Sequence, residues 1–522
     1  MKKLKPIILS GAEVYPLIEG GKGIAVSDGF SSGAWAHAGA VGTISGVIPD
    51  MLDKRGNVLP RLYKGKSRLE RHQELIRCAI QGGIDQAKKA YEIADGRGRI
   101  HMNLMWEMGG SISILEGIMD SCDAFARSLK EKVSGRFQNI AELFSAKLQS
   151  ALGGINDKVS NSKFIETCTP ILEGMLSEAK KYIHGITCGA GMPYKLGEIA
   201  SKHGIYYYPI VSSARAFRAL WLRSFKNYAE YLGGVVYEDP WLAGGHNGLS
   251  NGEDPAVPEA PMERVVELRR KMNEFGLQNT PIILAGGIWN LSEFEDFIDN
   301  PDIGPVAFQL GTRPLLTQES PVAKTWQKSL MNLKAGDVLL QKFSPTGFYS
   351  SAVKNNFLND LVERKQTQVP FKETPGGDFQ VAFPLAGTRR VYISLDDRRR
   401  IDDFYKKGRT VAMRTPDDTF VFVSPQTEAK IKKTRAQCVG CLSQCMFSGW
   451  SQGTPTHTTG RLPDPRSFCI SQTLYDVAHT PDVDNNLMFT GHNAYRFATD
   501  PMYENGNIPT VQELVDALLE GR

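Results

Sequence analysis

The chain has 522 residues and a mass of 57.7 kDa, enough for about three domains of roughly 150 residues each. Its 41% hydrophobic and 23% charged residues are typical of a globular protein and exclude a largely disordered or fibrous chain. The net charge of +4 is too small to require a nucleic acid as partner. Eight cysteines in this length exclude a disulfide scaffold. We see no export signal and no membrane-spanning segment, so we expect a cytoplasmic protein.

Short β-rich runs alternate with longer helical patterns over residues 1–335. The eight predicted strands cover residues 15–18, 41–45, 100–105, 183–187, 205–211, 234–237, 281–284 and 306–310. Apolar residues at helical spacing predict helices at 72–94 and 262–275, and the long third connection predicts an additional helical pair at 125–152. Eight strands each followed by a helix predict an α/β fold, the (β/α)8 barrel, with its active site at the carboxyl ends of the strands.

The regular alternation stops after the barrel. Residues 336–485 combine a predicted hairpin at 410–423 with loops and charge runs, and we expect them to form an additional mixed α+β domain. The segment 486–522 ends in an amphipathic helix at 511–519 and is expected to return to the barrel. The basic run 430–435 is interpreted as a solvated face, although it is also the feature through which a non-catalytic flavin-binding module would contact RNA or a protein partner.

Two glycine turns follow the seventh and eighth predicted strands, where this kind of barrel commonly binds a phosphate group. The first contains Gly286 and Gly287, and the second contains Gly311 and Thr312. Glycine lets main-chain N–H groups approach phosphate oxygens closely, so the pair of turns predicts a phosphate site. The alternative is that they are only tight turns that require a positive φ.

A third glycine turn follows the sixth strand and contains Ala243, Gly244, Gly245 and His246. Imidazole exchanges protons near neutral pH, and the glycines leave room for a flat ring beside it. We therefore predict His246 as a catalytic residue, against the alternative of a structural hydrogen-bonding histidine.

An ordered series of motifs makes the interpretation more specific. It reads EGGKG, AGAVGTISG, MNL, GAGMP, AGGHNG, LAGGI and QLGTRPLLTQES, between residues 14 and 332. This series resembles the nitronate monooxygenase (2-nitropropane dioxygenase) family of FMN-dependent barrels, to which flavin-dependent enoyl-ACP reductases are related. The closing segment 491–521 also resembles the end of family members.

The resemblance implies a non-covalent FMN. Its phosphate would lie on Gly286, Gly287, Gly311 and Thr312, its ring would pass Gly21 and Lys22, and its polar edge would meet Asn103 and the turn at 243–245. His246 matches the family's catalytic histidine. Lys22 stands where family members often have methionine, and a cation beside the flavin would stabilise its anionic reduced form.

Two activities follow from the resemblance. In the monooxygenase interpretation a nitronate reduces the flavin, and reaction with O2 gives a carbonyl compound and nitrite. In the alternative, NAD(P)H reduces FMN, a hydride passes to an enoyl or similar unsaturated substrate, and His246 helps to protonate it. The sequence does not fix the substrate, the electron donor or the oligomeric state.

Half of the cysteines lie in the additional domain, at positions 438, 441, 445 and 469. Thiolates at C-x2-C-x3-C spacing with a distant fourth suit an iron–sulfur cluster. The eight residues CVGCLSQC resemble the cluster loop of dienoyl-CoA reductase-like FMN barrels, which implies a 4Fe–4S cluster on Cys438, Cys441, Cys445 and Cys469. Zinc on the four cysteines, or on three of them with His457 or His479, is one alternative, and free buried thiols are another.

Overall fold

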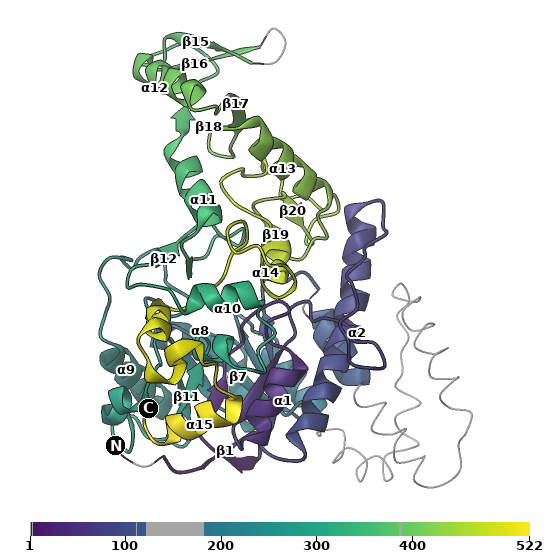
Figure 1. Cartoon of the computed structure of the whole chain (residues 1–522), viewed down its shortest axis with the longest axis vertical. Helices are drawn as coiled ribbons and strands as arrows, with labels where there is room; N and C mark the ends of the chain where they lie inside the picture. Colours follow the sequence, from purple (N-terminus) through teal and green to yellow (C-terminus); the bar gives the residue numbers. More distant parts are fainter. Residues whose placement is uncertain (1, 3, 111, 122–181, 386–388) are drawn as a thin grey trace, which may run out of the picture.

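The computed structural model describes residues 2, 4–110, 112–121, 182–385 and 389–522. The barrel strands are β3 Leu17–Glu19, β4 Val41–Ser45, β5 Arg99–Met105, β6 Gly185–Gly189, β7 Tyr206–Val211, β8 Val235–Glu238, β10 Ile282–Ala285 and β11 Val306–Leu310. They form a closed parallel barrel in the order β10-β11-β3-β4-β5-β6-β7-β8 (Figure 1). Each predicted run overlaps one of these strands, so the (β/α)8 barrel is confirmed.

The helices and 3-10 helices (η) up to residue 330 include α1 Gly29–His37, α2 Arg68–Ala94, α7 Leu196–His203, α8 Ala214–Arg223, η1 Phe225–Tyr231, α9 Pro261–Glu274, η2 Leu291–Phe297, η3 Arg313–Leu316 and α10 Lys324–Leu330. The predicted helix at 72–94 begins one turn earlier than expected. Ser67 caps it through the N–H of Glu70, while the Glu70 carboxylate accepts from the Ser67 N–H. The predicted helical pair at 125–152 lies outside the described residues.

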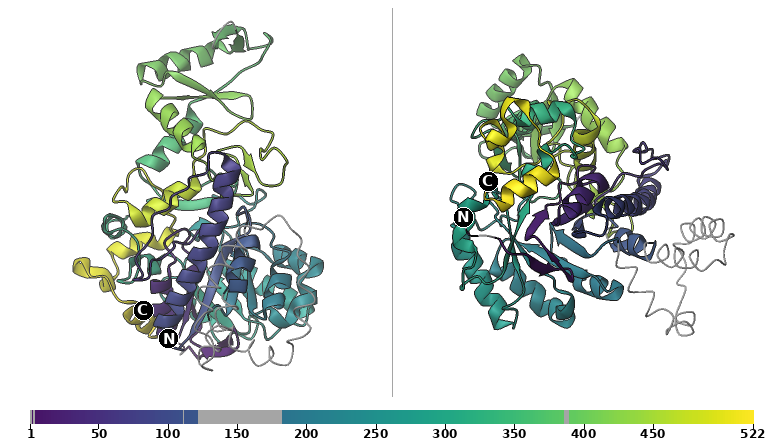
Figure 2. Two further views of the ribbon diagram at one scale, coloured as in Figure 1. Left: turned by 90° about the vertical axis from the view of Figure 1, so that its right-hand side faces the viewer. Right: turned by 60° about the horizontal axis from the view of Figure 1, so that its bottom comes forward.

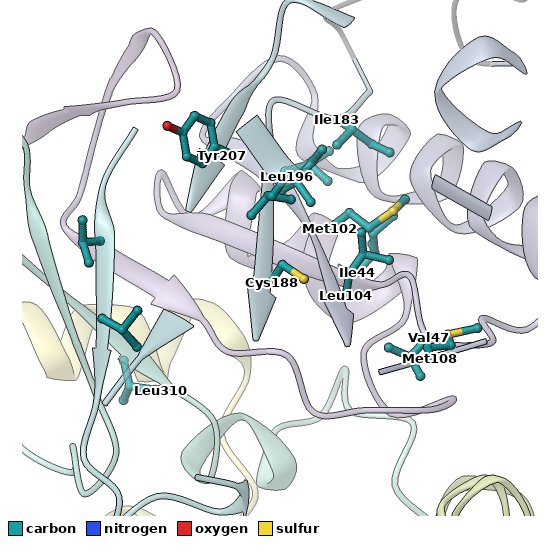
Figure 3. Close-up of a cluster of buried hydrophobic side chains, with 14 of the residues drawn as sticks. Ile44, Val47, Met102, Leu104, Met108, Ile183, Cys188, Leu196, Tyr207 and Leu310 are labelled. Carbon is teal, nitrogen blue, oxygen red and sulfur yellow. The ribbon is translucent and has the colours of Figure 1, made fainter. Parts of the chain in front are cut away.

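The barrel strands are buried on both faces. Ile18, Val236 and Ile283 belong to a cluster inside the barrel. Side chains that alternate with the inward ones, such as Met102 and Leu104 of β5, join a larger cluster between the strands and the helices (Figure 3). Burial on both faces explains why the strands read as nearly continuous apolar runs in the sequence.

An N-terminal hairpin, formed by β1 Ile7–Leu9 and β2 Ala12–Val14, was not predicted. Leu9 and Val14 pack into the interior cluster. In the turn between them, the Ser10 hydroxyl lies 2.9 Å from His101 Nε2 and 2.8 Å from the Tyr208 hydroxyl. The hairpin therefore joins the barrel interior through both apolar packing and hydrogen bonds.

Residues 336–485 contain β12 Val338–Gln341, β13 Ser350–Val353, α11 Asn356–Gln366, β14 Gln368–Pro370, β15 Val381–Pro384, β16 Arg390–Ile393, α12 Leu395–Lys406, β17 Val411–Arg414, β18 Thr419–Val423, α13 Pro425–Ala436, β19 Gln444–Cys445, β20 Trp450–Ser451 and α14 Ile470–His479. The predicted hairpin is the antiparallel pair of β17 and β18. β15, β16 and α12 lie at the end of the molecule away from both termini (Figure 1).

A core cluster that includes Val369, Phe383 and Phe422 lies within this segment. Leu442 and Trp450, by contrast, join the large cluster around the barrel. The division into units 1–335, 336–485 and 486–522 therefore stays a prediction.

The chain ends with η4 His492–Ala498, η5 Pro501–Gly506 and α15 Val511–Leu519. Leu514 and Leu518 of α15 are fully buried, and α15 packs beside α1 (Figure 2). In the part of the chain that the structure describes, no helix combines the length and apolar character needed to cross a bilayer.

Candidate active site

One pocket lies at the carboxyl ends of the barrel strands, the position of active sites in this fold. It is lined by every predicted flavin-binding residue and by the predicted catalytic residue: Gly21, Lys22, Asn103, Ala243, Gly244, Gly245, His246, Gly286, Gly287, Gly311 and Thr312. These residues come from loops that are far apart in the sequence. The fold thus brings the whole predicted set together, while the role of each member stays a prediction.

The two predicted phosphate turns form one side of the pocket. Gly286 and Gly287 have φ values of 87° and 76°, in the left-handed region that glycine adopts without steric cost. A Cβ atom on Gly286 would lie 3.0 Å from Asp239 O, so a side chain does not fit there. A Cβ atom on Gly311 would meet no atom within 4 Å, which leaves open space beside the second turn. Open space next to main-chain N–H groups fits the phosphate of FMN.

The C-terminal segment completes this side of the pocket. The Gly491 N–H donates to Thr312 Oγ1 at 2.9 Å, and Asn493 Nδ2 donates to the Gly287 carbonyl at 2.7 Å. Gly491 and Asn493 also line the pocket. Residues 491–521 resemble the C-terminal segment of family members, and this resemblance could have pointed to the site. The sequence analysis nevertheless did not predict Gly491 or Asn493 as site residues.

Gly21 and Asn103 lie in close contact at another wall of the pocket. A Cβ atom on Gly21 would lie only 2.3 Å from Asn103 Cγ. Residue 21 must therefore be glycine if the Asn103 amide is to keep its position at the pocket.

Lys22 lines the pocket and also forms a buried ion pair. Its side chain is only 1% exposed, and its ammonium pairs with the buried Glu19 carboxylate and donates to Ser31 Oγ at 3.2 Å. Glu19 also accepts from Ser31 Oγ at 2.6 Å and from the Thr43 N–H at 3.0 Å. The expectation of a cationic side chain next to the flavin stays a prediction, and the structure adds that the charge of this side chain is paired with Glu19. The buried ion pair holds the ammonium, and the exposed part of Lys22 at the pocket is its main chain.

Glu238, the last residue of β8, lines the pocket and was missed by sequence reasoning. Burial, and to a smaller extent the neighbouring Asp239, raise the pKa of its carboxyl group to about 8. The carboxyl group is therefore protonated at neutral pH and can donate a hydrogen bond into the pocket. An acidic residue at the carboxyl end of a predicted barrel strand was the signal that could have identified it.

Three separate segments position His246. It lies in β9 Gly245–His246, which pairs with β13 so that His246 is opposite Ser350. His246 Nε2 lies 2.7 Å from Ser344 Oγ, and the Phe489 ring meets the imidazole edge to face at 5.5 Å between centroids. Burial lowers the pKa of His246 to about 4, so the ring is neutral at pH 7.

The predicted metal centre is not confirmed. Among the described residues, no group of three His, Cys, Asp or Glu side chains could hold a metal ion. His479 Nε2 instead lies 2.8 Å from Asp50 Oδ2, and the His457 ring stacks on Trp450. The zinc alternatives that include a histidine are therefore not supported. Cys441, however, lies in the wall of the pocket.

Comparison with known proteins gives the following likenesses. FabK from Thermotoga maritima is 12% identical, with 97% of this chain and 92% of that chain covered and a TM-score of 0.45. The enoyl reductase domain of MlnA from the macrolactin biosynthesis cluster of Bacillus amyloliquefaciens is 12% identical. The match covers 97% of this chain and 93% of that chain, with a TM-score of 0.44. Nitroalkane oxidase from Streptomyces ansochromogenes is 15% identical. The match covers 66% of this chain and 78% of that chain, with a TM-score of 0.39.

The sequence matches no curated protein. The sequence model of the nitronate monooxygenase family matches residues 157–521, more than half of the chain. The matched range contains the histidine turn, both predicted phosphate turns and the C-terminal segment that contacts them. This chain accordingly belongs to the nitronate monooxygenase family and is an FMN-dependent oxidoreductase.

Proposed function

We propose that the enzyme oxidises alkyl nitronates with O2, forming a carbonyl compound and nitrite. The observation that carries this proposal is the neutral, buried imidazole of His246 in the wall of the pocket. Membership of the nitronate monooxygenase family supports the reaction class.

The residues at the pocket fit bound FMN. Main-chain N–H groups of the turns at Gly286–Gly287 and Gly311–Thr312 would hold the phosphate, and the main chain at Gly21 would lie along the ring. Bound FMN supplies the electron acceptor for the substrate's oxidation.

A neutral His246 suits this substrate class in two ways. An unprotonated ring nitrogen can accept the proton of a neutral nitroalkane, and a ring N–H can donate a hydrogen bond to the oxygen of a nitronate anion. Nε2 contacts Ser344 Oγ, so Nδ1 is the ring nitrogen left for a substrate. Nδ1 is unprotonated when Nε2 donates to Ser344, and it carries the N–H in the other tautomer, in which Ser344 donates to Nε2. Phe489 packs against the ring and limits water on that side.

The test is the substitution His246→Ala. Turnover of a nitronate such as propane-2-nitronate should fall by about 10²-fold or more, the usual contribution of a positioned acid or base. The FMN content should stay unchanged, because His246 lies outside the predicted phosphate turns. His37→Ala, which changes a histidine at the end of α1, is the matched control and should keep full turnover.

A second candidate function is NAD(P)H-dependent reduction of an enoyl or similar unsaturated substrate. The observation that favours it is Glu238, whose protonated carboxyl group lies at the pocket and could protonate a carbon atom. His246 suits that step less well, because a ring with a pKa of about 4 carries no extra proton at pH 7. Anaerobic flavin bleaching by NAD(P)H but not by nitronate would favour this candidate.

A further inference from the structure

The pocket has an apolar wall that the predicted flavin-binding residues do not provide. Its lining includes six aliphatic side chains, which we call the aliphatic wall: Ile24, Val47, Ile48, Leu442, Ile470 and Leu474. Val47 and Leu474 are 7% and 9% exposed, and the other four are more deeply buried. A chemical group that lies against the wall is therefore surrounded by hydrocarbon and shielded from water.

The aliphatic wall combines two parts of the chain that are far apart in sequence. Three of its residues come from the loops after β3 and β4, and three come from the segment after the barrel, on α14 or just before β19. Leu474 of α14 reaches the first glycine loop, because a Cβ atom on Gly23 would lie 3.7 Å from Leu474 Cδ1. The segment after the barrel thus supplies one side of the pocket.

Polar contacts hold α14 against the barrel. His479 Nε2, at the end of α14, lies 2.8 Å from Asp50 Oδ2, and the Arg61 guanidinium donates to Asp50 Oδ1 at 2.9 Å. The same guanidinium lies over the Tyr475 ring, 4.3 Å from its centroid. Asp50 belongs to the loop after β4, so these contacts fix the two parts of the aliphatic wall relative to each other.

Hydrogen bonds on both sides of Leu442 hold this residue at the pocket. The Gly109 N–H donates to the Cys441 carbonyl at 2.9 Å, and the Ser443 N–H donates to the Glu107 carbonyl at 2.6 Å. Ser443 Oγ also donates to Glu107 Oε2 at 2.8 Å. The loop that carries Leu442 is therefore tied to the loop after β5, and the wall is a preformed part of the pocket.

The two kinds of lining suit two different parts of a substrate. His246 and the glycine turns offer polar groups, which can orient an anionic nitronate group, whereas the side chains of the aliphatic wall offer none. Propane-2-nitronate has only two methyl groups beyond its charged group and would leave the wall largely uncovered. A longer hydrocarbon chain would cover it and gain the free energy of leaving water.

From this arrangement we propose that the substrate of this enzyme is a nitronate with an extended alkyl chain, and that the aliphatic wall binds this chain. The inference rests on the proposed nitronate oxidation and adds the class of nitronate. Short nitronates remain substrates, but with a higher KM, because they make fewer contacts with the wall.

The test is binding of straight-chain alkanoates, from acetate to octanoate, to the full-length enzyme with its flavin. A carboxylate is an unreactive planar anion like the nitronate group, and calorimetry measures its binding without turnover. Burial of one methylene group strengthens binding about fourfold, so Kd should fall about twofold to fourfold per added methylene. The heat-capacity change of binding should also become more negative along the series. A Kd that is independent of chain length, or no binding of octanoate, would overturn the proposal.

A pair of variants locates the alkyl chain. Leu474→Ala should raise the Kd of octanoate at least fivefold and leave that of acetate unchanged, which a general loss of structure would not do. Leu462→Ala changes a half-exposed side chain outside the pocket lining and should keep both Kd values. Equal effects on acetate and octanoate in Leu474→Ala would contradict the role of the aliphatic wall. If Leu474→Ala does not fold, the chain-length series of the wild-type enzyme decides alone.

Turnover measurements keep this test separate from that of nitronate oxidation. The value of kcat/KM should rise from ethyl nitronate to octyl nitronate in step with the affinity for alkanoates. Turnover with the same kcat/KM at every chain length would overturn the alkyl-chain site alone. Alkanoate binding that strengthens with chain length, in an enzyme that turns over no nitronate, would instead refute nitronate oxidation and leave an alkyl-chain site for another anion.

Discussion

His246 Nε2 lies 2.7 Å from the hydroxyl of Ser344, a residue 98 positions further along the chain. This contact joins the histidine turn of the barrel to the segment that follows β12. Because β13 of the same segment pairs with β9, two independent interactions fix the imidazole. Ser344 and Ser350, which follow the last barrel strand, therefore contribute directly to the geometry of the candidate active site.

Removing the Ser344 hydroxyl should slow turnover. In Ser344→Ala, the loss of one hydrogen bond worth about 1 kcal/mol should lower kcat for a nitronate roughly fivefold to tenfold, because the ring then samples other orientations. KM and FMN content should change little, which separates positioning from binding. Ser344→Thr keeps the hydroxyl and should restore kcat. An unchanged kcat in Ser344→Ala would show that the contact does not position the ring.

Glu238 should impose a pH dependence on substrate binding. Its pKa of about 8 lies above the ordinary value of 4.5, so the carboxyl group is neutral at pH 7 and becomes negative as the pH rises through about 8. The negative charge would repel a nitronate anion, and kcat/KM should fall over this range. Glu238→Gln stays neutral and should remove that part of the fall. Identical pH profiles for the two proteins would contradict this role of Glu238.

Buried neutral histidines should make the protein sensitive to acid. Burial lowers the pKa of His101 to about 3, whereas an unfolded histidine has a pKa of about 6.5. Below pH 6.5 the unfolded chain binds a proton that the folded state does not, so the free energy of unfolding decreases as the pH falls from 6.5 towards 3.

Substitution of His101 isolates this effect. Between about pH 7 and about pH 5 the wild-type protein should lose roughly 2 kcal/mol more unfolding free energy than His101→Gln, which cannot titrate. Denaturant unfolding at both pH values measures the difference. His184 has a similarly low pKa of about 3 for the same reason and should behave in the same way. Equal losses in wild type and variant would contradict a neutral buried His101.

Gly21 should be required for flavin binding. In Gly21→Ala the new Cβ would lie 2.3 Å from Asn103 Cγ, so the Asn103 side chain or the main chain at residue 21 must move. We expect the Kd for FMN to rise at least tenfold, as measured by fluorescence titration. Gly376→Ala is the matched control, since its Cβ would meet no atom within 4 Å and its φ is not positive. Equal FMN affinity in the two variants would exclude close packing at Gly21 as a condition for binding.

The barrel was predictable because its strands have a simple physical signature. Strands buried on both faces, such as β4 and β11, are short runs of mainly apolar and small residues without charges, and the structure begins and ends both at the predicted residues. The hairpin of β1 and β2 was missed because its strands have only three residues each, too few to show alternation. Its stability comes from packing of Leu9 and Val14 into the barrel, which local sequence does not reveal.

The site was predictable where it consists of glycine turns at strand ends, and not where it depends on partners distant in sequence. His246 was identified from its own loop, but Ser344 and Phe489 were not, because nothing near them in sequence indicates a contact with the barrel. The buried ion pair of Lys22 was not predicted for the same reason. Its partner Glu19 precedes it by three residues, yet only the fold shows that both side chains are buried together.

The most direct test of the account is anaerobic mixing of the purified enzyme with propane-2-nitronate while the flavin absorbance is followed. The account predicts flavin bands in the purified protein, rapid bleaching by the nitronate, and recovery on admission of O2 with release of nitrite and acetone. Flavin that is bleached by NAD(P)H but unaffected by the nitronate would contradict nitronate oxidation as the function of this site.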